Sequence, residues 1–185
     1  VKGPLNMLWF TDLGFPMPSR HGRGRAPLLL DGRMFIQGRD GVMCVDAYNG
    51  RKLWDYSLPG IQAVYDGEHL MGTSGTASNF CIGDHGLYVH TGESCLRIDP
   101  TTGRLLGKFA APDQPDGEPG TWGMIACVGD TLFGTLANTE HVVTYRFGEG
   151  DMRTQFSESM LLFATDASTG ELKWRFQPEH SIRNN

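Results

Sequence analysis

The stretch Ala164-Thr-Asp166-Ala-Ser-Thr-Gly170-Glu-Leu-Lys-Trp174 has two counterparts upstream in this chain. One reads Cys44-Val-Asp46-Ala-Tyr-Asn-Gly50-Arg-Lys-Leu-Trp54, and a more distant one reads Arg97-Ile-Asp99-Pro-Thr-Thr-Gly103-Arg-Leu-Leu-Gly107. In each, the Asp side chain can accept backbone N–H bonds from the following turn, and the Gly can adopt a positive φ. Each copy therefore predicts two strands joined by a tight turn.

A longer unit surrounds each copy. An aromatic residue precedes the repeated Asp by 11 residues in the first two units, Phe35 before Asp46 and Tyr88 before Asp99. In the third unit the same distance is 33 residues, which predicts an insertion of 22 residues between two strands. No segment has the apolar period of a helix. Four strands per unit, at a spacing of about 50 residues, are typical of a β-propeller blade.

We therefore expect an all-β chain, a partial β-propeller of about three four-stranded antiparallel blades. Blade 1 is expected at about 20–58, blade 2 at about 76–110, and blade 3 at about 121–177 with an insertion at 134–160; residues 179–185 would begin a further blade. A blade must stack on its neighbours to bury both of its faces. We expect either that the chain is part of a longer protein with more blades or that copies of it associate.

The composition limits the class of protein. The chain has 185 residues, of which 39% are hydrophobic and 25 are Gly, and its formal net charge is −5. This balance excludes an intrinsically disordered chain. It also argues against a nucleic-acid partner, because phosphate contacts need a basic surface. The longest apolar stretches are far shorter than the roughly 20 residues of a membrane-spanning helix.

The copy at 164–174 matches the pattern A-x-D-x-x-x-G-x-x-x-W completely. It resembles the tryptophan-docking motif of the PQQ-like (quinoprotein alcohol dehydrogenase-like) β-propeller repeat proteins, and the first copy differs only by Cys44 in place of Ala. The second has Arg97 and Gly107 at the Ala and Trp positions, so the resemblance supplies no packing aromatic there. It implies that the Trp packs across the seam between blades. The expected docking residues are Asp46, Gly50, Trp54, Asp99, Gly103, Ala164, Asp166, Gly170 and Trp174.

The resemblance implies two functions. The first is a non-catalytic binding or assembly scaffold, as a fragment of a larger bacterial protein that is periplasmic or extracellular, whose partners are further blades or other proteins. The alternative is a fragment of a PQQ-dependent alcohol or sugar dehydrogenase that uses PQQ and calcium. Such enzymes resemble one another in an adjacent Cys pair, a Trp that stacks on the quinone, and a calcium site.

The chain lacks part of that cofactor signature. None of its cysteines is adjacent to another, so we expect no cofactor in this portion and assign no catalytic or metal-binding residue. Trp122 could stack on a quinone or could be a core aromatic. The cysteines could be buried thiols, or Cys81 and Cys127 could form a disulfide. The acidic segment 113–120 is expected to be a turn, because its spacing does not fit a calcium loop.

Two further segments could bind a partner. The insertion holds Tyr145, Arg146 and Phe147, residue types favoured at interfaces, although it could equally be a structural flap. A cluster of arginines precedes the first strand of blade 1, and one His and one Arg occupy a similar position at 180–183. These side chains could face the mouth of a propeller channel and bind an anion or an acidic partner, or they could be solvated. They are Arg20, His21, Arg23, Arg25, His180 and Arg183.

Overall fold

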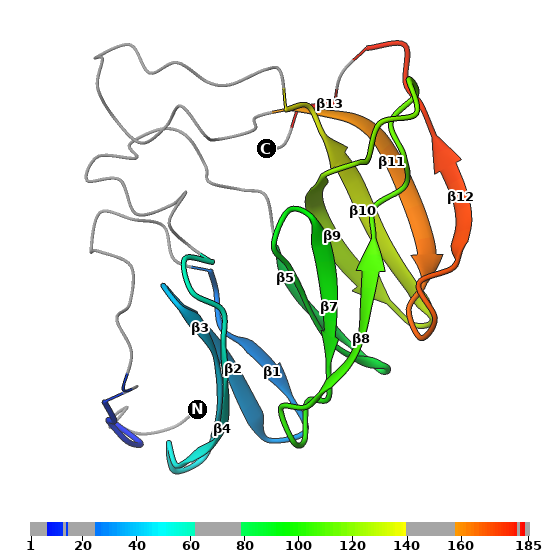
Figure 1. The fold of residues 1–185 in the computed structure, drawn as a ribbon. Helices are drawn as coiled ribbons and strands as arrows, with labels where there is room; N and C mark the ends of the chain where they lie inside the picture. Colours follow the sequence, from blue (N-terminus) through cyan, green and yellow to red (C-terminus); the bar gives the residue numbers. More distant parts are fainter. Residues whose placement is uncertain are drawn as a thin grey trace, which may run out of the picture.

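The computed structural model describes residues 7–12, 14, 25–61, 79–139, 158–180 and 182–183. These residues form three antiparallel sheets, arranged side by side, and contain no helix (Figure 1). Within these ranges there is accordingly no helix that could cross a membrane. The sheets confirm the predicted all-β class and the three four-stranded units.

Each sheet is a meander in which consecutive strands pair. The first consists of β1 (Leu28–Leu30), β2 (Arg33–Gly38), β3 (Gly41–Asp46) and β4 (Lys52–Ser57). The second consists of β5 (Phe80–Gly83), β6 (Gly86–His90), β7 (Ser94–Ile98) and β8 (Leu105–Ala110). The third consists of β9 (Trp122–Val128), β10 (Thr131–Ala137), β11 (Glu158–Asp166) and β12 (Leu172–Phe176).

The third sheet differs from the other two in two ways. Its middle strands, β10 and β11, pair although 20 residues separate them in the sequence, and most of these, 140–157, lie outside the described residues together with Tyr145, Arg146 and Phe147. It also gains β13 (Ile182–Arg183), which pairs with the start of β11. Two residues of the segment expected to begin a further blade thus extend the third sheet here.

The core lies in the seams between sheets. One cluster joins the first and second sheets and includes Phe35, Trp54 and Leu87, while another joins the second and third and includes Phe109, Ile125 and Phe163. Strands β1 and β5 are in contact, as are β5 and β9, so the first strands of the three sheets lie next to one another. Such stacking buries both faces of the middle sheet, as the repeat requires.

Candidate functional site

The three repeated Asp residues form nearly identical turns. Asp46, Asp99 and Asp166 each use Oδ1 to accept hydrogen bonds from the backbone N–H groups two and three residues later, at 2.7–3.2 Å. The Gly four residues after each Asp has a φ of 71°, 73° or 80°, a left-handed conformation that favours Gly. The repeated Asp and Gly therefore build one rigid turn in each sheet.

The turn of the second sheet holds the tryptophan of the first. Trp54 donates from Nε1 to the Pro100 carbonyl at 3.0 Å. Its ring lies against Gly103, so close that a Cβ added to Gly103 would be 2.8 Å from the nearest ring atom. The indole is largely buried, in contact with the cluster between the two sheets. We call this arrangement, an aromatic ring on the turn Gly with a bond to a turn carbonyl, a seat.

A second seat occurs at the first sheet, where the repeated motif predicts no aromatic. Trp9 donates from Nε1 to the Ala47 carbonyl at 2.9 Å, and an added Cβ at Gly50 would be 2.5 Å from its ring. The signal in the sequence is weak, because Trp9 has no Asp turn before it. Only the Leu-Trp pair that it shares with Leu53-Trp54 could have revealed it.

The seam between the second and third sheets uses other residues. Phe109, two residues beyond Gly107, lies on Gly170, the turn Gly of the third sheet. Since Phe has no donor, the Tyr88 hydroxyl donates to the Ala167 carbonyl at 2.6 Å, and Arg97 donates to the Ser168 carbonyl. Phe109 thus provides the ring, and Tyr88 and Arg97 provide hydrogen bonds to the turn, whereas Trp54 provides both ring and hydrogen bond by itself.

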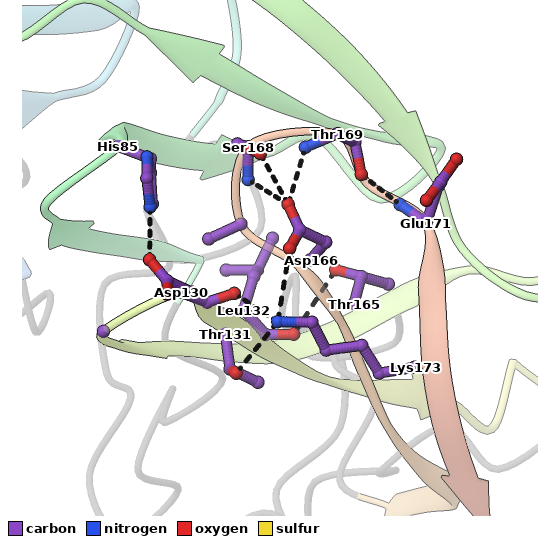
Figure 2. Close-up of polar contacts among 12 residues, drawn as sticks. His85, Asp130, Thr131, Leu132, Thr165, Asp166, Ser168, Thr169, Glu171 and Lys173 are labelled. Atoms are coloured by element: carbon purple, nitrogen blue, oxygen red, sulfur yellow. Dashed lines mark hydrogen bonds and ion pairs between the residues drawn. The ribbon is translucent and has the colours of Figure 1, made fainter.

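Charged side chains join the same turns at the surface (Figure 2). His85, in the turn between β5 and β6, contacts Asp130 of the third sheet, with Nε2 and Oδ1 2.6 Å apart. Lys173 donates from Nζ to the Asp130 carbonyl at 2.6 Å and lies 3.3 Å from Asp166 Oδ2. The Ser168 hydroxyl donates a hydrogen bond to the Asp166 carboxylate, and the backbone N–H groups of Ser168 and Thr169 donate further ones. These bonds hold the pKa of Asp166 far below its usual range. These groups are exposed or half-buried, so they stabilise turns but shelter no acid or base from solvent.

Buried polar side chains gather at the opposite end of the sheets. Gln37, His90 and Thr135 are all buried, and each follows by two residues the repeated aromatic of its second strand. Ser159, at the start of β11, donates to Thr135 Oγ1 at 2.8 Å. We call this set the polar end. Its positions repeat from blade to blade, although the residue types differ.

His90 is the titratable member of the polar end, and its pKa is strongly lowered. Burial lowers its pKa to about 3, and the nearby positive charge of Arg25 acts in the same direction. Its Nδ1 accepts a bond from the Gly92 N–H at 3.2 Å. The imidazole is therefore neutral at physiological pH.

The predicted channel residues are placed only in part. Arg25 reaches the polar end, where its Nε donates to Asn79 Oδ1 at 3.0 Å. His180 is exposed, and Arg183 lies in β13. Arg20, His21 and Arg23 lie outside the described residues. The common channel mouth therefore stays a prediction.

The remaining candidates lie in the core. Trp122 is buried 4.9 Å from the Phe163 ring, centroid to centroid, and donates from Nε1 to the Phe109 carbonyl at 3.3 Å. All cysteines are free thiols, and burial raises the pKa of Cys44 to about 11 and those of Cys81 and Cys95 further. Within the described ranges no three His, Cys, Asp or Glu residues come together as metal ligands.

Two solved structures of dehydrogenases are similar to this stack of sheets. A europium-containing methanol dehydrogenase superposes with a TM-score of 0.53 at 16% identity, over 83% of this chain and 32% of that one. A quinohemoprotein alcohol dehydrogenase from Pseudomonas putida HK5 gives a TM-score of 0.53 at 20% identity, over 82% of this chain and 20% of that one. The chain therefore has the fold of a partial β-propeller. The predicted partial propeller is thereby confirmed.

One curated protein is also similar to the chain in sequence. The dehydrogenase subunit of the quinone alcohol dehydrogenase of Komagataeibacter europaeus is 24% identical over 189 residues, which cover 97% of this chain. The chain spans 23% of that relative's length. No protein-family model matches the chain.

Proposed function

We propose that this chain is a non-catalytic PQQ-like β-propeller module that acts as a binding or assembly scaffold within a larger protein. The supporting observation is that the repeated residues and their neighbours bond the turns of their own sheet or of the next sheet. Trp54 bonds the Pro100 carbonyl, Tyr88 bonds the Ala167 carbonyl, and the three Asp carboxylates bond their own turns. These groups stabilise the stack.

A second candidate is part of a PQQ-dependent alcohol or sugar dehydrogenase. The quinone alcohol dehydrogenase relative favours it. The residues present do not fit the cofactors, because no two cysteines are adjacent in the sequence and the described ranges bring no three metal ligands together. We therefore derive no catalytic step for this chain.

One assay separates the two candidates. The full-length protein that contains this chain is incubated with PQQ and calcium, and reduction of an electron-accepting dye is followed with primary alcohols and with sugars. The scaffold proposal predicts no rate above that of PQQ and calcium without protein. Equilibrium dialysis of PQQ against the full-length protein provides a readout that does not depend on turnover. Saturable PQQ binding together with substrate-dependent dye reduction would establish the dehydrogenase instead.

The polar end supports a narrower proposal for what the scaffold binds. Arg25 is positioned by Asn79, and the predicted channel mouth would bring the guanidinium groups of Arg20, Arg23 and Arg183 to the same site. Guanidinium groups suit carboxylates and phosphates. Titration with an acidic peptide, followed by calorimetry, should give salt-dependent binding that Arg25→Gln weakens several-fold. Equal affinity for both proteins would count against this site.

A further inference from the structure

The turn of the first sheet contains an Asn-Gly pair that the other two turns lack. Asn49 precedes Gly50, and no other Asn in the chain is followed by Gly. The equivalent pairs in the second and third turns are Thr102-Gly103 and Thr169-Gly170. Asn is a chemically labile residue in proteins. It is most labile before Gly, because no side chain then hinders the approach of the following backbone nitrogen to the Asn amide.

The Asn49 side chain has the same structural role as the two Thr side chains. Its Oδ1 accepts a hydrogen bond from the Arg51 N–H at 2.9 Å. Thr102 and Thr169 each accept with Oγ1 the bond from the N–H two residues later, at 3.4 and 3.2 Å, and Figure 2 shows the bond to Thr169. Because a Thr hydroxyl is sufficient for this bond, the turn does not require the amide of Asn49.

Asn49 is exposed to solvent, whereas Gly50 is buried beneath the Trp9 ring. Thr102 is also exposed, although its sheet has a neighbour on both faces. The exposure of this turn position is therefore independent of whether a further blade covers the first sheet.

The turn both promotes and restrains an attack on the Asn49 amide. The Arg51 N–H that bonds Oδ1 would stabilise negative charge developing on that oxygen, as donors do in an oxyanion hole. The attacking group would be the Gly50 backbone nitrogen, whose hydrogen is donated to the Asp46 carbonyl at 2.8 Å. The nitrogen can reach the amide only when this bond opens. Trp9 opposes the opening, because its ring lies on Gly50 and its Nε1 is hydrogen-bonded to the same turn.

We propose that Asn49 is a site of spontaneous deamidation and that Trp9, in the seat of the first sheet, sets the rate. The Gly50 nitrogen attacks the side-chain carbonyl carbon of Asn49, and the new C–N bond closes a cyclic imide. The proton of that nitrogen passes through water to the side-chain amide group, which leaves as ammonia. Water then opens the imide at one of its two carbonyl groups, which leaves an aspartate or an isoaspartate at this position.

The isoaspartate product would release the seat. Its main chain runs through the former side-chain carbon, so one extra atom separates position 49 from Gly50. This moves Gly50 away from the Asp46 carbonyl and from the Trp9 ring. The aspartate product keeps the main chain and an acceptor for the Arg51 N–H. The inference goes beyond the proposed scaffold function and does not depend on it.

The test incubates the full-length protein that contains this chain in a mildly alkaline buffer. Peptide mapping by mass spectrometry follows the amide at position 49, and isomerisation of Asp-Gly pairs does not enter because it leaves the mass unchanged. Trp9→Phe keeps a ring but loses the Nε1 bond. We expect it to lose the amide about fivefold faster, the effect of one hydrogen bond on an opening equilibrium. Trp9→Ala, which also removes the ring, should be faster still.

Two matched variants serve as controls. Asn49→Thr gives this turn the residue of the other two turns, so the protein should stay folded and the peptide should keep its mass. Tyr88→Phe weakens the other seam without touching the turn 46–50, so Asn49 should react at the rate seen in the unmodified protein.

Three results would overturn the proposal. One is an equal rate in the unmodified protein and in both Trp9 variants, and another is an amide that persists in all of them. The third is an acceleration by Tyr88→Phe as large as that by Trp9→Phe, because the reaction would then follow global unfolding. Dye reduction does not enter this readout, so failure here leaves the scaffold-or-dehydrogenase assay intact.

Discussion

At the scale of single residues, the repeated Gly has two separate roles. Its positive φ allows the turn, and its missing side chain makes room for an aromatic ring from the neighbouring sheet. Gly103 has both roles, whereas Gly117, with a φ of 90° and open space around it, has only the first. The pair therefore separates backbone strain from steric exclusion.

We expect Gly117→Ala to lower the free energy of unfolding by about 1 kcal/mol, the strain of a left-handed residue. Gly103→Ala should cost about 2–4 kcal/mol, because its methyl group also displaces the Trp54 ring. Urea unfolding followed by circular dichroism measures both. Equal costs for the two variants would show that the ring does not occupy the seat.

His90 predicts how stability depends on pH. Its pKa is about 3 in the folded chain and close to 6.5 when unfolded, so between these values the unfolded chain binds a proton that the folded chain does not. The free energy of unfolding should therefore fall as the pH decreases below 6.5, with a slope approaching about 1.4 kcal/mol per pH unit. The slope is compared between pH 6.5 and about 5.5, because carboxylates with ordinary pKa values near 4 begin to titrate below that range.

The matched variant is His90→Gln, since Gln37 stands at the equivalent position of the first sheet. The variant should lose most of this slope while remaining folded. Urea unfolding at a series of pH values gives the comparison. Parallel pH profiles for the two proteins would mean that His90 is not buried as a neutral group.

At the scale of strands and seams, the sequence predicted the meanders better than the contacts between them. Alternating apolar residues and D-x-x-x-G turns are local, and they predicted the three sheets. The insertion expected at 134–160 lies mostly outside the described residues, and its ends belong to β10 and β11. The seam partners depend on how two sheets are shifted against each other. The motif therefore left the second seam without an aromatic, although Phe109 and Tyr88 fill it, and it overlooked Trp9, which has no turn of its own.

Phe109 and Tyr88 both contact the turn of the third sheet, and the hydrogen bond of Tyr88 can be tested separately. Tyr88→Phe removes the hydroxyl that bonds the Ala167 carbonyl in a buried seam, so we expect a loss of about 1–2 kcal/mol in stability. Tyr48→Phe, at an exposed position, should change stability by less than about 0.5 kcal/mol. Thermal unfolding of both variants under one set of conditions is sufficient. A neutral Tyr88→Phe would place the seam's polar contact elsewhere.

At the scale of the whole molecule, the stack is directional: it begins with a filled seat at the first sheet and ends with an exposed aromatic pair on the third. The middle sheet has both faces buried, whereas the third has one exposed. Trp54→Ala should therefore cost about 3–5 kcal/mol of unfolding free energy. Trp174→Ala, the same change at the exposed end, should cost less than half as much in a monomer, as measured by urea unfolding at low protein concentration.

The most direct measurement concerns the three equivalent indoles. In a nuclear Overhauser spectrum of the labelled chain, the account predicts cross-peaks from the Trp54 ring to the Gly103 α-protons and from the Trp9 ring to those of Gly50, with no turn Gly in contact with Trp174. Absence of the Trp54–Gly103 cross-peaks in the folded chain would contradict the claim that the repeated residues hold neighbouring sheets together.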